Sequence, residues 1–242
     1  MTSVINKPYQ TINWRPDCPY VILLSVSICS PGVINMLKSR LQFIIRITAF
    51  IIALGGTFSR IFLSLNGDMG SNVFLYFTVQ SNLIVCLYLG IEVLGRSKPM
   101  KPAVQGGVLM YITITGLVYN ILLAPGWHPE GIDLLITTIN HTITPLLFLL
   151  DWILSQEYGT YRKKHLLYWL IYPLCYALFA SIEGALTGDF RYFFMDFINQ
   201  STREYLLLML MVILVFLFIG FVILKFNNLN LRRKEAENGI AD

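Results

Sequence analysis

DLLITTINHTITPLLFLLDW, residues 133–152, has the length and the apolar character of a helix that crosses a lipid bilayer. Its middle nevertheless carries four polar residues, Asn140, His141, Thr142 and Thr144. Because the bilayer core contains no water, each of these side chains needs a partner inside the protein. An ionisable residue in a membrane span is by default a functional candidate, and a hydrogen-bonded packing role is the alternative. His141 is therefore the residue from which the search for a site starts.

The composition of the chain indicates a polytopic membrane protein. Of the 242 residues, 55% are hydrophobic and only 13% are charged, and the mean hydropathy is +0.62. A soluble domain carries about 25% charged residues. The net charge is +4, but the basic residues form short clusters beside apolar segments, which argues against a nucleic-acid partner. The four cysteines show no CxxC spacing and no nearby histidines, so no metal site is expected.

Six segments are long and apolar enough to span a bilayer, at about 41–64, 73–94, 103–124, 132–154, 166–186 and 204–226. The predicted fold class is all-α, a bundle of six transmembrane helices that forms a single domain over residues 41–226. Because short loops join the segments, helices that follow one another should be antiparallel neighbours. Residues 227–242 are predicted to form a basic cytoplasmic tail.

Residues 1–40 precede these segments and are open to three interpretations. Residues 20–36 are apolar but only marginally long, and a Ser-Pro-Gly sequence interrupts them, so they are either a seventh span or a signal-like segment. In the third interpretation the natural start is Met36, and the preceding residues are an extension. We favour the third, with residues 1–40 otherwise disordered or interfacial.

The distribution of lysine and arginine predicts the orientation of the bundle. Basic clusters lie before the first span, between the second and third, between the fourth and fifth, and after the sixth. The opposite loops at 65–72 and 125–131 contain no lysine or arginine, and the loop at 187–203 contains only Arg191 and Arg203. Since cytoplasmic loops carry the excess of positive charge, both termini are predicted to be cytoplasmic. A seventh span at 20–36 would move only the N-terminus to the outside.

The second span carries a polar face. Thr78, Ser81 and Asn82 follow one another at i, i+3 and i+4, which places them on one side of a helix. Small and amide side chains also hydrogen-bond across membrane helices, so helix association is the alternative to a site. On spacing alone, helix association is favoured.

The fourth span surrounds His141 with polar residues one turn away. Thr137, Thr138 and Thr144 lie at i−4, i−3 and i+3, and Pro145 lies at i+4. Proline has no backbone N–H, so the carbonyl of His141 loses its helical partner and a local kink is expected. A kinked polar face predicts a hydrated or substrate-binding cavity, and a satisfied core histidine is equally compatible. Thr78 and His141 both fall in the predicted outer half of the membrane, at about 8 and 14 Å from the start of their spans.

Several charged residues also lie within the spans. Arg46 and Arg60 lie near opposite ends of the first span and are expected either to snorkel or to pair with acidic groups. Glu183 of the fifth span is a candidate partner for an arginine, and Asp151 is expected at the membrane interface. Their roles stay open at this stage.

Four stretches resemble a known family. LYFTVQSNLIV (75–85), GLVYNILL (116–123), INHTITPLLFLLDWIL (139–154) and YPLCYALFASIEGALTG (172–188) occur in this order. They resemble the androgen-induced gene 1 family of multi-pass membrane proteins, especially its bacterial branch, over residues 41–226. The FTxxSN and NHxxxP pieces are the most specific. Glu183 departs from the pattern, because a basic residue is expected before Gly184.

The resemblance implies an activity, since eukaryotic members are described as hydrolases of fatty acid esters of hydroxy fatty acids (FAHFAs). The family's threonine corresponds to Thr78 and its histidine to His141. The resemblance implies that Thr78 is the nucleophile, and a hydroxyl nucleophile needs a base such as His141. Ser81 and Asn82 are candidate oxyanion donors, and Asn140 adds polar support. No carboxylate is evident to orient His141, which favours a dyad.

The functional hypothesis is therefore an intramembrane threonine hydrolase of lipophilic, fatty acid-type esters in the inner cell membrane. Membrane lipids would surround the protein and supply its substrate. Water would be the co-substrate, and no cofactor is expected. The alternative is a non-enzymatic multi-pass protein, namely a transporter, a lipid-binding protein or a sensor. Transporters often contain internal repeats, and none is evident between the two halves of this chain.

Overall fold

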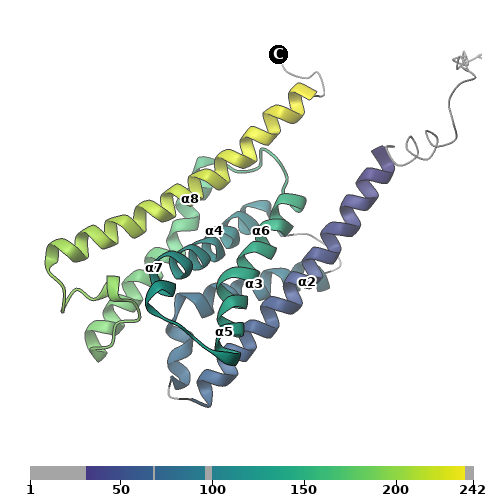
Figure 1. Cartoon of the computed structure of the whole chain (residues 1–242). Helices are drawn as coiled ribbons and strands as arrows, with labels where there is room; N and C mark the ends of the chain where they lie inside the picture. The colour runs from purple at the N-terminus through teal and green to yellow at the C-terminus, as the bar shows by residue number, and fades with distance from the viewer. Residues whose placement is uncertain (1–30, 68, 96–99, 238–242) are drawn as a thin grey trace, which may run out of the picture. The chain divides into compact units, whose positions relative to one another are not determined.

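The computed structural model describes residues 31–67, 69–95 and 100–237 (Figure 1). The chain divides into two compact units, residues 1–41 and 42–242. The described part of the first unit, residues 31–41, consists of the first turns of helix α2 (Pro31–Leu65). The remainder of α2 and all later elements belong to the second unit, which contains the candidate site.

The described residues form helices and turns and contain no β-strand. After α2 come α3 (Phe77–Leu94), α4 (Pro102–Val118), α5 (Gly131–Thr138), α6 (Thr144–Ser155), α7 (Lys163–Thr187) and α8 (Thr202–Glu237). The turns η2 (Tyr119–Leu123) and η4 (Ile139–Ile143) are π-helical; η4 joins α5 and α6 into one span. Short 3₁₀ segments are η1 (Gly70–Leu75), η3 (Ala124–Gly126) and η5 (Phe193–Met195).

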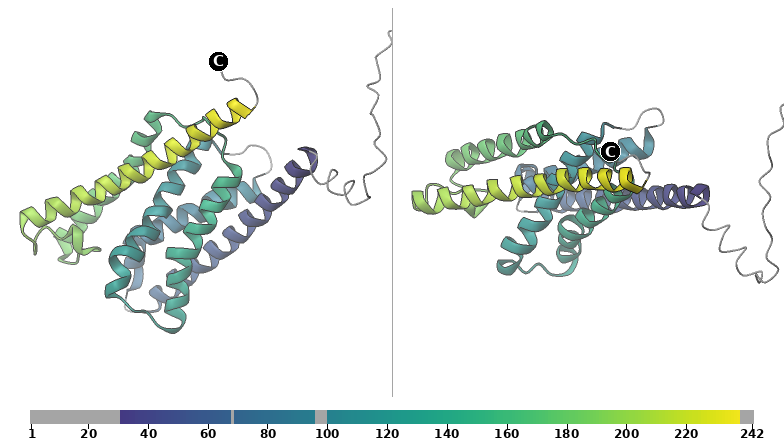
Figure 2. Two further views of the ribbon diagram at one scale, coloured as in Figure 1. Left: turned by 45° about the horizontal axis from the view of Figure 1, so that its top comes forward. Right: turned by 90° about the horizontal axis from the view of Figure 1, so that it is seen from above.

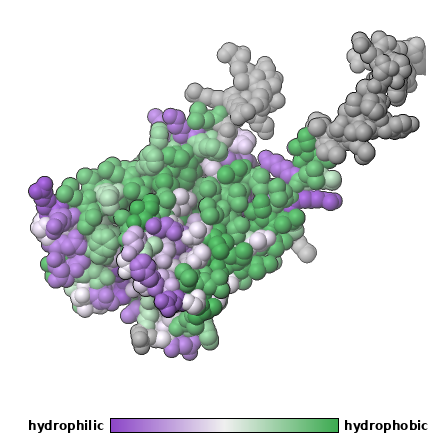
Figure 3. Space-filling model, in the orientation of Figure 1, coloured by the Kyte–Doolittle hydropathy of each residue, from purple (hydrophilic) through white to green (hydrophobic). Residues whose placement is uncertain are grey.

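Six of the described helical segments are long and apolar enough to cross a membrane, which confirms the all-α polytopic bundle. Large apolar side chains on these segments are exposed, as expected for surfaces that face lipid tails rather than water. Figure 3 shows apolar residues over much of the visible face of the helices. The segments are Val33–Leu65, Phe77–Leu94, Pro102–Gly126, Gly131–Ser155, Lys163–Thr187 and Thr202–Leu229.

The boundaries differ from the predicted ones at three helix ends. α2 begins at Pro31 instead of near residue 41, and α8 continues to Glu237 instead of ending near 226. Hydropathy marks only the apolar part of a helix, whereas lysine and arginine are good helix formers that extend it. α3 begins at Phe77 instead of 73, because Tyr76 has an extended backbone with ψ of 132°. Most of the suggested span at 20–36 lies outside the described residues.

α4 lies among the other helices of the second unit and contacts α3, α6, α7 and α8 (Figures 1 and 2). Its central residues Val108–Ile112 are almost all fully buried. Glycines allow close approach at several points; a Cβ atom on Gly106 would lie 2.5 Å from the Trp169 ring of α7. Small residues at such contacts are typical of membrane helix packing, where dispersion replaces the hydrophobic effect.

A buried ion cluster ties four helices together at the end of the bundle opposite the candidate site. Arg46 of α2 bonds Glu92 of α3 at 2.8 Å and Asp151 of α6 at 2.9 Å. Gln105 of α4 donates to Asp151 at 3.3 Å. Asp151 is 0% exposed and therefore lies inside the bundle, one turn before the end of α6 at Ser155, and its interfacial depth stays a prediction. The arginine of a distant span supplies the partner that makes its burial possible.

Candidate functional site

Two π-helical turns lie side by side in the candidate site, η2 at the end of α4 and η4 in the fourth span. Such turns are rare and occur frequently at functional sites. The distortion expected around Pro145 is present, because α6 starts at Thr144 directly after the π turn. The carbonyl of His141 accepts a hydrogen bond from the Asn120 side chain at 3.1 Å. A side chain of η2 thus supplies the partner that Pro145 removes.

Gly116 allows this contact between α4 and η4. A Cβ atom at position 116 would lie 2.9 Å from the carbonyl oxygen of His141 and 3.2 Å from the Pro145 ring. Asn120 also donates to the carbonyl of Gly116 in α4 at 2.8 Å. One amide of η2 therefore bonds both α4 and η4.

The hydrogen bonds of His141 define its tautomer. Its Nδ1 lies 2.9 Å from the carbonyl oxygen of Thr137. A carbonyl oxygen only accepts hydrogen bonds, so Nδ1 carries the proton and Nε2 keeps its lone pair in the neutral ring. Tyr119 stacks on the imidazole with a centroid distance of 4.0 Å. Within the described residues, no hydrogen bond joins His141 to a carboxylate, and a backbone carbonyl takes the orienting role.

Thr78 lies in the first turn of α3, and tyrosines of later elements hold this turn. Tyr176 of α7 accepts from the backbone N–H of Phe77 at 3.1 Å and donates to the carbonyl of Leu75 at 2.9 Å. Tyr192, from the loop between α7 and α8, lies beside Thr78, and the two residues border the same cavities. Burial raises the pKa of Tyr192, and its interaction with Thr78 opposes that rise in part.

Ser81 and Asn82 are buried beneath Thr78 and bond mainly to backbone carbonyls. Ser81 Oγ lies 3.0 Å from the carbonyl oxygen of Thr78 and 2.8 Å from the hydroxyl of Thr115. Asn82 Nδ2 donates to the carbonyl of Thr78 at 2.9 Å and to that of Asn140 at 3.2 Å. The predicted polar face of the second span therefore connects α3 with α4 and η4.

Asn140, the residue before His141, lines the site and anchors η4 to α2. Its Nδ2 donates to the carbonyl of Gly56 at 3.1 Å. Its Oδ1 atom and that of Asn82 are buried and have no hydrogen-bond partner within the described part of the chain. Two unused acceptors therefore lie in the same neighbourhood.

Thr78 and His141 line the same cavity. This cavity, of about 640 Å³, is also bordered by Asn140, Tyr119 and Tyr192. Most of its lining is apolar, but it contains charged and polar side chains that the second cavity lacks, and we call it the polar cavity. No hydrogen bond among the described residues joins Thr78 to His141, and Tyr192 borders the cavity beside Thr78. Ser81 and Asn82 lie outside the cavity wall and support it.

Thr78 also borders a second, apolar cavity of about 400 Å³ between α3, α4, α7 and α8. Tyr119, Leu123 and Tyr192 are shared with the polar cavity, whereas His141 borders the polar cavity alone. Most walls of the apolar cavity are aliphatic or aromatic. The hydroxyl of Thr78 thus stands where a polar and an apolar space meet.

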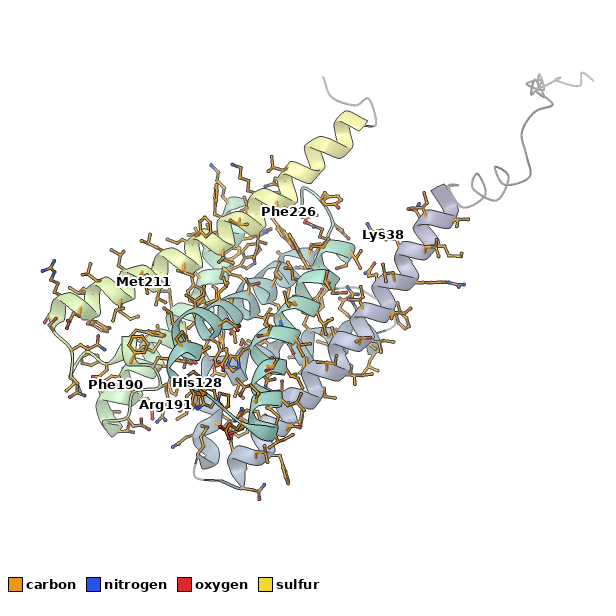
Figure 4. All side chains as sticks on the ribbon, viewed as in Figure 1. Lys38, His128, Phe190, Arg191, Met211 and Phe226 are labelled. Carbon is orange, nitrogen blue, oxygen red and sulfur yellow. The ribbon has the colours of Figure 1, made fainter. Side chains whose placement is uncertain are left out.

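Two arginines border the polar cavity, and each has acidic partners. Arg60 bonds Asp133 at 2.9 Å and the hydroxyl of Thr137 at 2.8 Å. Arg191 bonds Glu183 at 2.6 Å, which confirms the expected arginine partner for that glutamate. This bond raises the pKa of Arg191 above its ordinary value. Figure 4 shows Arg191 and His128 at the same end of the helices, with Phe226 towards the other end of α8.

One carboxylate, that of Asp133, borders the polar cavity, and it is paired with Arg60 at 2.9 Å. No group of three or more His, Cys, Asp or Glu side chains that could hold a metal is present within residues 31–67, 69–95 and 100–237. The sequence did not single out Tyr192, because it belongs to an irregular loop without periodicity. Asn120 lies in the GLVYNILL stretch, but spacing alone did not indicate its contact with His141.

No family model, no curated protein and no solved structure matches the chain. The residues themselves and the geometry of the two cavities therefore carry the functional argument.

Proposed function

We propose that the protein is an intramembrane hydrolase of lipophilic, fatty acid-type esters, with Thr78 as the nucleophile and His141 as its base. The observation that carries this proposal is the shared cavity, into which both residues face from different helices. The resemblance of the FTVQSN and NHTITP stretches to the androgen-induced gene 1 family points to the same pair.

The proposed first step forms an acyl-enzyme. His141 Nε2 takes the proton of Thr78 Oγ1, and Oγ1 attacks the ester carbonyl carbon. The bond from this carbon to the alcohol oxygen then breaks, and the proton passes from Nε2 to the leaving oxygen. Water then gives a proton to Nε2, and its oxygen attacks the acyl carbon. The bond from this carbon to Oγ1 breaks, Nε2 returns the proton to Oγ1, and the free acid leaves. The hydrogen bond from Nδ1 to the carbonyl of Thr137 orients the ring for these transfers.

The catalytic contact between Thr78 and His141 would form when substrate binds. Catalytic hydrogen bonds are often long in the free enzyme and shorten when substrate binds. The Tyr192 hydroxyl, which borders the same cavity, would donate to the developing oxyanion. We propose this role for Tyr192 because the donors of Ser81 and Asn82 already bond carbonyl oxygens and Thr115.

The proposed setting is the inner cell membrane with both termini in the cytoplasm, as the lysine and arginine distribution predicts. In this orientation, the Thr78 site lies in the outer half of the membrane. Substrate would enter from the surrounding lipid, and water would reach the site past Tyr76 and Phe193, which border the polar cavity.

A fluorophosphonate probe tests the nucleophile. The purified protein in detergent should be labelled at Thr78, labelling should vanish in Thr78→Ala, and it should fall strongly in His141→Ala. Thr138→Ala is the matched control, because Thr138 bonds the carbonyl of Leu134 at 2.8 Å and does not border either cavity. Equal labelling of folded Thr78→Ala would refute the assignment. Folded wild type that is never labelled but binds fatty acids would favour a lipid-binding protein.

A further inference from the structure

The two cavities that meet at Thr78 differ in what they offer a substrate. His141 and the two arginines border only the polar cavity. The apolar cavity has walls such as Ile114, Leu170, Ala177, Val212 and Phe216, from three different helices. An ester bound at Thr78 presents its two halves to these two spaces.

Proton transfer decides which half lies on which side. The leaving alcohol oxygen must receive its proton from His141 Nε2, so the alcohol half has to lie on the His141 side of the carbonyl carbon. The acyl carbon stays on Thr78 Oγ1 after the alcohol leaves. The acyl chain must then extend away from His141 and into the apolar cavity. The water that releases the acid needs the same base, so it also arrives through the polar cavity.

We infer that the apolar cavity is the acyl-chain site and that the polar cavity receives the leaving alcohol and then water. The inference rests on the proposed function. Burial of methylene groups supplies about 0.8 kcal/mol each, which gives a preference for long acyl chains over short ones.

The apolar cavity also has a route to the lipid. Leu174, Leu178 and Ile213 line it, yet they are 53%, 65% and 41% exposed. These residues belong to α7 and α8, so the opening lies between those two helices on a surface that faces lipid tails. An acyl chain can enter there without crossing water.

The test uses nitrophenyl esters in which the acyl chain grows from two to twelve carbons while the alcohol stays constant. A second series keeps the acetyl group and lengthens the alcohol chain. The variant Ala177→Phe fills the apolar cavity from α7. Ala185→Phe is the matched control, because Ala185 is exposed on the same helix and borders neither cavity.

The wild type should hydrolyse the twelve-carbon acyl ester with a kcat/KM at least tenfold above that of the acetyl ester. Ala177→Phe should lower this ratio at least tenfold, and Ala185→Phe should keep it. In the alcohol series, the dependence of kcat/KM on chain length should be the same for the wild type and the two variants. If Ala177→Phe does not fold, Val212→Phe blocks the same cavity from α8.

An unchanged acyl-chain ratio in a folded blocking variant would overturn the cavity assignment and leave the proposed function standing. An effect confined to the alcohol series would show that the two halves bind the other way round. Absence of Thr78-dependent hydrolysis in the wild type would overturn the proposed function and the inference that rests on it.

Discussion

Asn82 donates a hydrogen bond from its side-chain amide to the carbonyl oxygen of Asn140 at 3.2 Å. The same nitrogen donates to the carbonyl of Thr78 at 2.9 Å. Because Asn140 precedes His141 in the chain, one amide group joins the turn of the proposed nucleophile to the turn of the proposed base. Asn82 lies outside both cavities, so we treat it as a positioning residue.

Replacement of Asn82 by alanine should destabilise the protein and slow the reaction. The carbonyl of Asn140 loses this donor, whereas that of Thr78 keeps Ser81 Oγ, and each lost hydrogen bond costs about 0.5–1.5 kcal/mol. Thermal unfolding in detergent and the rate of fluorophosphonate labelling measure the two effects. Asn66→Ala is the control, because that amide is exposed and bonds only within its own turn. Equal melting temperatures for the two variants would contradict the linking role.

The contact between Gly116 and the fourth span predicts that Gly116→Ala is destabilising. The added methyl group would meet the carbonyl oxygen of His141 at 2.9 Å, and overpacking of this kind costs about 1–3 kcal/mol. Gly55→Ala is the matched control, since a Cβ atom there has no atom within 4 Å. Alanine in a helix is about 1 kcal/mol better than glycine, so the control should be neutral or stabilising in thermal unfolding. A tolerated Gly116→Ala would show that α4 can move away from η4.

The buried cluster at Arg46 predicts a strong dependence of stability on this one arginine. Arg46→Gln leaves Asp151 and Glu92 without their cation, and such losses cost about 3–5 kcal/mol. Asp151→Asn should cost less, because the pair of Arg46 with Glu92 remains. Thermal unfolding measures the two effects, and the melting temperature of Arg46→Gln should be the lower one. The reverse order would mean that Glu92 is not an effective partner.

The phenol of Tyr192 predicts a defined pH behaviour. An ordinary tyrosine loses its proton near pH 10, and burial raises the pKa of Tyr192 above that value. A raised pKa means that the protonated form is favoured in the folded protein, so the hydroxyl remains a donor at pH 9. Esterase activity of the wild type at about pH 9 should therefore be at least that at pH 7.

The variant Tyr192→Phe separates the donor role of Tyr192 from its packing role. It keeps the ring but removes the hydroxyl, and kcat should fall about 10²–10³-fold if the hydroxyl supports the oxyanion. The melting temperature is the control for packing. A folded variant with the kcat of the wild type would exclude Tyr192 as the oxyanion donor.

The six spans could be predicted from the sequence because length and hydropathy are properties of each segment alone. The shared cavity of Thr78 and His141 agrees with the depth comparison, since both residues lie near the starts of spans that run in the same direction. The burial of Asp151 could not be predicted because it depends on Arg46, more than a hundred residues away. Tyr192 was missed because the packing of Phe194 and Met195 positions its loop, and no periodic pattern reports such packing.

Arg46 and Arg60 bond opposite ends of the same span, through Asp151 and Asp133. They are separated along α2 by about 21 Å, at about 1.5 Å per residue. Apolar helices in lipid have few features that fix their sliding position, whereas ion pairs fix register. A shift of α2 by one turn would break both pairs together. The two ion pairs therefore fix a single antiparallel register between α2 and the fourth span. His141 lies between the two pairs along that span.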